Sequence, residues 1–201
     1  LDPLNFTAAY SVRGYINYAD KQYAAAIKEL EKSIAIQPAY AYSYCVLGRV
    51  LADLRKTDEA LEKYTSAIEI DPDYYLPYLY RGGLYRKNGK YDEALSDYSK
   101  VISLNPRNLE SYYCSGLIYY LTGKYSSAAE EFSKALYLNE LSSPLYYNRA
   151  IAYRKSGENE KAVEDYKSYL LLSVKDLEET ATDSLANSWM NESDLKPIMP
   201  D

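Results

Sequence analysis

The chain contains no histidine, and this absence excludes most of the common catalytic sites. A Ser-His-Asp triad, a Cys-His pair and a histidine-bound metal all need an imidazole. Lys90 and Lys124 follow glycines in a way that suggests a phosphate-binding loop, but the earlier glycine of that motif is missing at the required spacing. The carboxylates are scattered at helical spacing, which is typical of a solvated face. We therefore expect a protein that is not an enzyme, with no cofactor and no metal site.

Long apolar runs and an excess of basic charge are also lacking. No stretch approaches the roughly 20 apolar residues that span a bilayer, so membrane insertion is not expected. The net charge of −6 argues against binding to a nucleic-acid backbone. The two cysteines, Cys45 and Cys114, lie two repeat lengths apart, too far for a disulfide in the stacked array described below. We expect free thiols in a reducing, cytoplasmic compartment.

A period of 34 residues runs through the sequence. A fixed period of this size predicts an array of stacked units, each of which buries its apolar face only against its neighbours. Alanine recurs with this step at Ala26, Ala60, Ala94, Ala128 and Ala162. Tyrosine does so at Tyr10, Tyr44, Tyr78, Tyr112 and Tyr146.

Each unit is expected to contain two helices joined by a tight turn. In the third unit the apolar spacing predicts helices over 75–87 and 92–104, with Gly89 in the turn between them. Glycine tolerates the left-handed conformation that ends a helix. Small residues at Gly82 and Ala94 are expected to let the two helix backbones approach closely.

Five units fit the chain, at residues 7–40, 41–74, 75–108, 109–142 and 143–176. Residues 1–6 resemble the close of a preceding segment or repeat, so we expect the chain to be a piece of a longer protein. Over 177–190, Leu177, Ala181, Leu185 and Trp189 recur every four residues, which predicts an amphipathic helix that caps the last unit. A docking helix for a partner or a second copy is the alternative. Residues 191–201 are expected to be a tail.

The repeated pattern resembles the tetratricopeptide repeat family. The second unit carries it as Tyr44, Leu47-Gly48, Leu51, Ala60, Tyr64, Ala67 and Pro72. The third carries it as Tyr78, Gly82, Tyr85, Ala94, Tyr98 and Pro106. The resemblance implies an all-α fold, a right-handed α-solenoid of antiparallel helix pairs with a C-terminal capping helix. Asn17, Glu140, Tyr169 and Val174 depart from the family pattern.

The resemblance also implies where a ligand binds, because in this family the first helix of each repeat lines a concave groove. The groove positions carry more basic than acidic side chains, and tyrosine and arginine are common interface anchors. We therefore expect a peptide-binding groove that attracts an acidic segment; the alternative is that these are ordinary solvated positions. The candidate residues are Tyr15, Tyr18, Tyr42, Arg49, Gly83, Arg86, Lys87, Tyr113, Tyr120, Tyr147, Arg154 and Lys155.

Two known ligand-binding patterns of the family do not match. The positions of the chaperone carboxylate clamp hold Ser11, Tyr15, Val46, Leu76 and Tyr80, so that clamp is expected to be absent. The asparagine ladder is missing too, because the sixth positions of the first helices are Val12, Val46, Tyr80, Cys114 and Asn148. We expect a non-catalytic protein–protein interaction scaffold whose partner is a protein or peptide. The alternatives are a self-association module and a substrate-recruiting domain of a larger enzyme.

Overall fold

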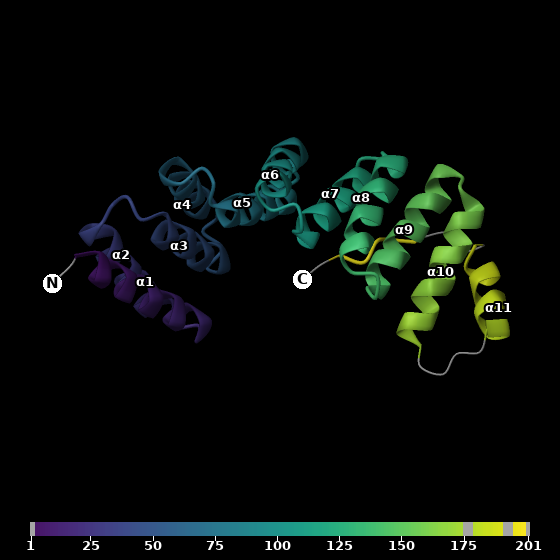
Figure 1. The fold of residues 1–201 in the computed structure, drawn as a ribbon, viewed down its shortest axis with the longest axis horizontal. Coiled ribbons are helices and arrows are strands. Elements are labelled where there is room, and N and C mark those ends of the chain that lie inside the picture. Colours follow the sequence, from purple (N-terminus) through teal and green to yellow (C-terminus); the bar gives the residue numbers. More distant parts are fainter. Residues whose placement is uncertain (1–2, 175–178, 191–194, 200–201) are drawn as a thin grey trace. The chain divides into compact units, whose positions relative to one another are not determined.

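In the computed structural model the chain is a series of antiparallel helix pairs (Figure 1). The structure describes residues 3–174, 179–190 and 195–199, and these residues contain eleven helices and no strand. The helices are α1 (Pro3–Ala19), α2 (Tyr23–Ile36), α3 (Ala41–Asp53), α4 (Thr57–Ile70), α5 (Tyr75–Lys87), α6 (Tyr91–Leu104), α7 (Leu109–Leu121), α8 (Tyr125–Leu138), α9 (Ser143–Ser156), α10 (Asn159–Ser173) and α11 (Glu179–Trp189).

The chain divides into two compact units, unit 1 (Leu1–Pro106) and unit 2 (Arg107–Asp201). In unit 1 the pairs are α1–α2, α3–α4 and α5–α6, and in unit 2 they are α7–α8 and α9–α10, with α11 against α10. The first helices of successive repeats contact each other, as α1 with α3, α3 with α5 and α7 with α9. We call the surface formed by these first helices the A face of each unit.

The helices of a pair lie close because a glycine on the first faces a ring on the second. A Cβ atom added at Gly48 would lie 2.6 Å from the Tyr64 ring, and one added at Gly116 would lie 2.6 Å from the Phe132 ring. The five repeated alanines of the second helices are all fully buried. The close contact expected from the small residues is therefore confirmed.

The turns within the pairs use two solutions. Gly89, Gly123 and Gly157 adopt positive φ angles of 73°, 77° and 87°, as expected for glycines that end a helix. In the first two repeats Lys21 and Arg55 take the same left-handed conformation without being glycine, at φ 59° and 63°. The turn geometry is thus kept even where the glycine is not.

Helix α11 packs with a different face from the one that the four-residue spacing predicts. Thr182, Ala186 and Trp189 are buried, whereas Leu185 is 47% exposed, so the prediction was wrong at Leu185. The reason is that Trp189 stacks flat on Tyr166, with ring centroids 4.3 Å apart and an interplanar angle of 8°. This contact rotates the helix so that the residues three and seven positions before Trp189 also turn inward. Leu177 lies outside the described residues.

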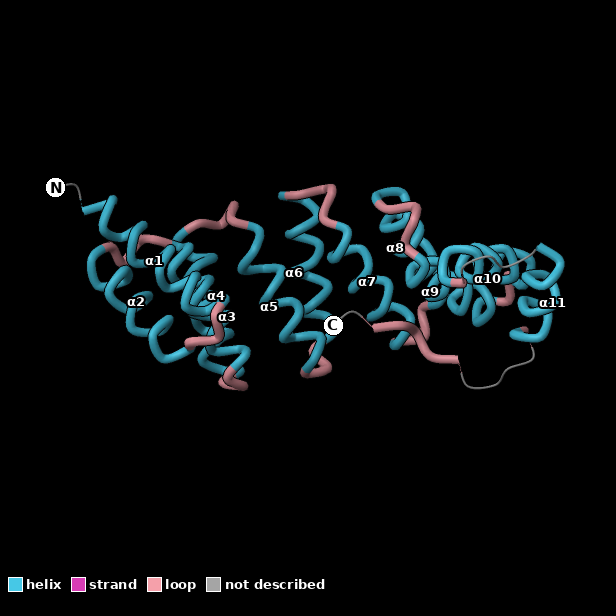
Figure 2. Tube along the Cα trace, turned by 90° about the horizontal axis from the view of Figure 1, so that it is seen from below, coloured by secondary structure: helices cyan, strands magenta, loops and turns pink. Residues whose placement is uncertain are grey.

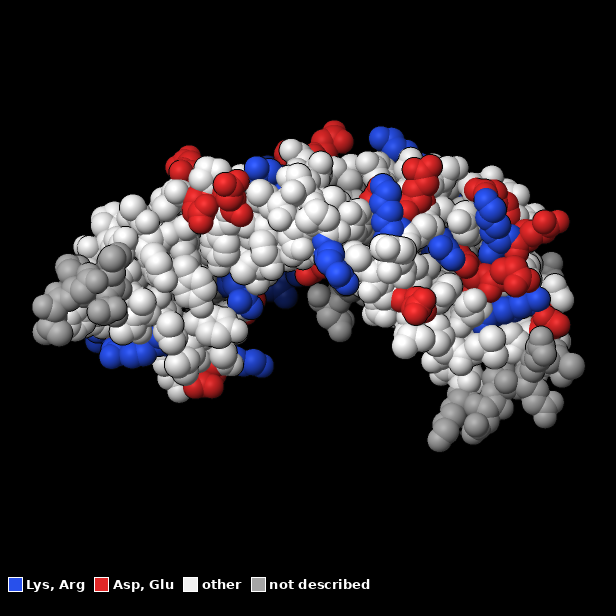
Figure 3. Space-filling view, viewed as in Figure 1, with Lys and Arg blue, Asp and Glu red and all other residues white. Residues whose placement is uncertain are grey.

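Charged side chains on the second helices of unit 2 are paired locally. Lys134, Lys161 and Lys167 each lie within 3.3 Å of a glutamate three residues earlier in the chain, Glu131, Glu158 and Glu164 respectively. Figure 3 shows the result over α8 to α10, where basic and acidic side chains lie next to one another. This arrangement leaves no strong field of one sign there, and exposed pairs of this kind contribute little to stability.

Among the described residues, the structure contains no candidate membrane-spanning helix.

Candidate functional site

The A face of unit 1 carries seven of the candidate residues, and Arg49 on α3 lies at the centre of one group. Its guanidinium carbon lies 4.8 Å from the ring centroid of Tyr18, 4.9 Å from that of Tyr80 and 5.9 Å from that of Tyr15. Burial raises the pKa of Tyr18, and the Arg49 charge works against that shift. Arg49 is therefore already engaged in cation–π contacts, which hold its charge among tyrosines.

The other basic residues of this face lie on α5. Arg86 is half-buried, and within the described residues its Nε donates no hydrogen bond. Lys87 is exposed. Next to them, a Cβ atom added at Gly83 would have no neighbouring heavy atom within 4 Å. This part of the face is open and carries two positive charges.

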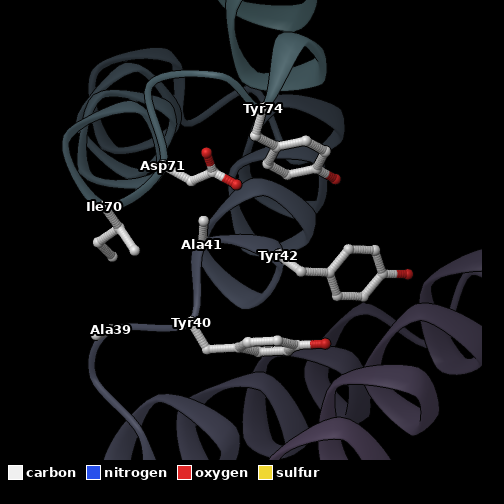
Figure 4. A pocket seen from close by; sticks show the side chains of 7 residues that line it. All are labelled: Ala39, Tyr40, Ala41, Tyr42, Ile70, Asp71 and Tyr74. Atoms are coloured by element: carbon white, nitrogen blue, oxygen red, sulfur yellow. The ribbon is translucent and has the colours of Figure 1, made fainter.

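Tyr42 lines a shallow pocket on unit 1 together with Tyr40 and Tyr74 (Figure 4). Tyr40 and Tyr74 hold equivalent positions, each at the residue just before the first helix of its repeat. The three rings project to the same side, and the Asp71 carboxylate lies beside Tyr74. In the buried cluster against which Tyr74 packs, burial raises the pKa of the Cys45 thiol to about 12, so this cysteine is a protonated packing residue.

The A face of unit 2 differs because the C-terminal residues 195–199 of the chain lie on it. This segment runs back beside α9 and α7 (Figures 1 and 2). Its residues adopt neither helix nor strand. The sequence predicted a tail at 191–201. Of these residues, 195–199 contact the A face of unit 2, and 191–194 and 200–201 lie outside the described part of the chain.

Asn148 on α9 holds one residue of this segment at both of its backbone groups. The Asn148 Oδ1 accepts a hydrogen bond from the Ile198 backbone N–H at 2.6 Å. The Asn148 Nδ2 donates to the Ile198 carbonyl at 2.7 Å and to the Tyr113 hydroxyl at 2.9 Å. Tyr113 in turn donates to the same carbonyl at 2.5 Å. Asn148 is fully buried, and all its polar atoms are used.

Other candidate residues of unit 2 contact either this segment or Trp189 at the end of α11. The Tyr120 hydroxyl donates to the Leu195 carbonyl at 3.4 Å, a long hydrogen bond. The Arg154 guanidinium lies 5.2 Å from the centroid of the Trp189 ring and donates to the Trp189 carbonyl at 3.3 Å. Tyr147 meets the same indole edge-on, with ring centroids 6.5 Å apart. Lys155 is exposed and stands outside this group.

Leu195 completes the contact through its side chain. It packs against a buried cluster that contains Ala150, Ile151, Ala162 and Trp189. Helix α11 therefore supplies one wall of the site through Trp189, and α9 supplies the floor. Of the twelve candidates, the structure places Tyr113 and Tyr120 against the C-terminal residues, Tyr147 and Arg154 against Trp189, and Tyr15, Tyr18 and Arg49 around one another.

The sequence interpretation missed Asn148 as a binding residue. Asn148 occupies the sixth position of its helix, where the other first helices carry valine, valine, tyrosine and cysteine. These residues do not form the asparagine ladder of the family, so the position was not predicted to bind a ligand. The signal in the sequence is that, at this position of the first helices, only the fifth repeat carries a side-chain amide. Its importance depends on the C-terminal residues, which local spacing does not bring to α9.

Within the described residues no group of three or more histidine, cysteine, aspartate or glutamate side chains is placed to hold a metal ion.

Comparisons with known proteins bear on the family and the fold. Tetratricopeptide repeat models match residues 7–40, 41–74, 63–96, 109–140 and 143–173, and a further TPR repeat model matches 82–123. A search of curated protein sequences found no match.

Three similar solved structures are distant in sequence. A crystal structure of MamA is 21% identical, with a TM-score of 0.76, covering 86% of this chain and 97% of that one. Pseudomonas aeruginosa pilF is 22% identical, with a TM-score of 0.75 and coverage of 94% and 91%. YrrB, described as a TPR protein with an unusual peptide-binding site, is 16% identical, with a TM-score of 0.72 and coverage of 89% and 90%.

At these identities the structures show the shared α-solenoid fold and nothing finer, whereas the repeat models together span residues 7–140 and 143–173. The chain belongs to the tetratricopeptide repeat family, whose members are protein-interaction scaffolds.

Proposed function

We propose that the A face of unit 2 is a binding site for an extended polypeptide segment. The observation that carries this proposal is the pair of hydrogen bonds between the Asn148 side chain and the N–H and C=O of Ile198. A side-chain amide that binds both backbone groups of one residue recognises a peptide unit whatever side chain that residue carries. YrrB, which shares the fold, is described as having a peptide-binding site, and this supports the same use of the face here.

The surroundings of Asn148 suit a ligand of this kind. A buried amide is costly when its hydrogen bonds are unmade, so the face favours an occupant that supplies both a donor and an acceptor. Tyr113 adds a second donor to the same carbonyl. The apolar cluster around Ile151 and Trp189 adds a place for one apolar side chain, so the site combines backbone and side-chain recognition.

The test is selection of a random peptide-display library on a protein of residues 1–201. Asn148→Leu removes both backbone hydrogen bonds at similar volume, and Tyr113→Phe removes one donor. We expect selected peptides to lose binding at least tenfold with Asn148→Leu and less with Tyr113→Phe. Asn159→Leu, an exposed position at the start of α10, is the matched control and should leave binding unchanged. Peptides that bind Asn148→Leu as well as the parent chain would contradict the proposal.

For unit 1 we propose that Arg86 and Lys87 attract an acidic segment to the open surface beside Gly83. The charges are close in sequence and lie on the last turn of α5, so their fields add. A labelled oligoglutamate peptide should bind with an affinity that falls as salt rises, and Arg86→Glu with Lys87→Glu should abolish this binding. Lys63→Glu with Lys100→Glu changes the charge equally on the second helices and should have little effect. If the second pair abolishes binding and the first does not, the acidic ligand lies on the other face.

A further inference from the structure

Residues 195–199 meet the A face of unit 2 in the way a separate ligand would. The segment has no regular secondary structure, and it is held at two points, the side chain of Leu195 and the backbone of Ile198. Three residue steps separate the two points, which corresponds to a span of about 10 Å for extended backbone. A helix could not present both groups to the same face in this way, because its backbone N–H and C=O groups are used internally.

The residues between the two points explain why this segment is a good occupant. Pro197 fixes its own φ angle, and it also pushes Lys196 toward extended geometry. An extended segment that is already stiff loses less conformational entropy when it binds. Lys196 is exposed, so the site places no demand on that side chain. The pattern that fits the site is therefore an apolar residue, any residue, a proline, and a fourth residue that is bound through its backbone.

We infer that residues 195–199 are a built-in occupant of this site, and that an outside partner is an extended segment with the same pattern that must displace them. The inference rests on the proposed function of unit 2. Only residues 191–194 join α11 and Met190 to the bound segment. A short connection of this kind gives an effective local concentration on the order of 1 mM, so the occupant competes strongly with a free peptide. A partner peptide must therefore bind the site tightly enough to compete with the covalently attached residues 195–199.

The experiment uses a fluorescein-labelled peptide with the sequence of residues 193–201, titrated into chains of residues 1–201 and followed by anisotropy. Leu195→Asp places a charge in the apolar cluster and should release the tail. The peptide should then bind at least tenfold more tightly than it binds the parent chain. Met199→Asp places the same charge at a position in the tail that is 45% exposed, and it should bind the peptide like the parent. Asn148→Leu should abolish binding in every background.

The outcomes separate the inference from the proposed function. Equal affinity for the parent chain and Leu195→Asp, with continued dependence on Asn148, would overturn the built-in occupant and leave the binding site standing. If library peptides need Asn148 but the labelled peptide binds no chain, the assigned sequence pattern is wrong. If no peptide of any kind depends on Asn148, the proposed function itself fails.

Two further measurements keep these outcomes clear. The circular dichroism spectrum of Leu195→Asp should match that of the parent chain, since the tail packs on helices that are already formed, while its melting temperature should fall, because an occupant that binds only the folded state stabilises it. Light scattering over a concentration series should give a monomer for both. A dimer of the parent chain that disappears in Leu195→Asp would show that the tail is exchanged between two copies and would overturn occupation within one chain.

Discussion

Arg81 and Asp97 join α5 to α6 through two parallel hydrogen bonds, of 2.9 Å from Nε and 2.8 Å from Nη2. The remaining guanidinium nitrogen, Nη1, donates to Thr65 Oγ1 on α4 at 3.0 Å. One arginine thus connects the two helices of its own repeat and the second helix of the repeat before it. The guanidinium carbon also lies within 6 Å of the ring centroids of Tyr78 and Tyr85.

The same arrangement recurs two repeats later. Arg149 binds Asp165 at 2.6 and 2.7 Å and Ser133 at 3.0 Å. Arg13 stands at the equivalent position of the first repeat and pairs with Glu29. The inter-helix ion pair therefore occurs in the first, third and fifth repeats, whereas the equivalent positions of the second and fourth repeats hold Leu47 and Ser115.

Removal of Arg81 should destabilise unit 1 strongly. Asp97 is 5% exposed, so Arg81→Met leaves a buried carboxylate without its cation and should cost about 3–5 kcal/mol. The free energy of unfolding in urea measures this. Lys134→Met breaks an exposed pair and should change it by less than about 1 kcal/mol. If Arg81→Met is as mild as Lys134→Met, the pair does not hold the repeats together. Asp97→Leu added to Arg81→Met should restore much of the loss, because no unpaired charge then remains.

Two glycines on first helices of unit 1 should respond to alanine in opposite directions. Gly48→Ala places a methyl group 2.6 Å from the buried Tyr64 ring and should cost about 1–3 kcal/mol by overpacking. Gly83→Ala meets open space and should stabilise α5 by about 0.5–1 kcal/mol, because alanine is the better helix former. Thermal melting of the two variants beside the parent chain is sufficient. The same sign for both changes would mean that the helix contact is not as close as described.

Ala94 should tolerate no larger side chain. It is fully buried where α5 and α6 meet, so Ala94→Leu should lower the free energy of unfolding by about 1–3 kcal/mol. Ser96→Leu, on the exposed side of the same helix, is the control. An Ala94→Leu chain that melts like the parent would show that the repeat register is wrong.

Trp189 offers a direct reporter for the position of α11, since it is the only tryptophan in the sequence. Its indole is 1% exposed and stacks on Tyr166. Tyr166→Ala should therefore shift the fluorescence emission to longer wavelength and destabilise unit 2, because a large buried ring contact is lost. Leu185→Ala changes an exposed position on the same helix and should leave the emission where it is. An unchanged emission in Tyr166→Ala would place α11 elsewhere.

The Cys45 thiol should be inert in the folded protein. Its ordinary pKa of 9.0 is raised to about 12 by burial, so the nucleophilic thiolate is scarce at pH 8 and appears only as the pH approaches 12. In a Cys114→Ala chain, iodoacetamide should react with Cys45 much more slowly in buffer than in urea. A cysteine at an exposed site, Ser103→Cys in a chain without the other two, should react at the same rate in both. Fast labelling of native Cys45 would contradict its burial.

The sequence alone was sufficient for the helices of the repeats, because their signals are local or strictly periodic. The helices expected over 75–87 and 92–104 are observed as Tyr75–Lys87 and Tyr91–Leu104. Each repeat contacts only its neighbours. A glycine opposite a ring, or an alanine at every 34th residue, therefore indicates how neighbouring helices pack. The tetratricopeptide repeat family followed from the same positions.

The tertiary structure decided what lies on the A faces. Tyr113 and Ile198 share a hydrogen bond although 85 residues separate them, and no periodic pattern relates a repeat to the end of the chain. It also decided that Arg49 and Arg154 are engaged by aromatic rings, because a charge read from sequence carries no information about its neighbours in space. Local spacing fixes which side of a helix is apolar. Only packing determines that Trp189 turns inward with Ala186, that Leu185 faces solvent, and that Asn148 meets a backbone amide.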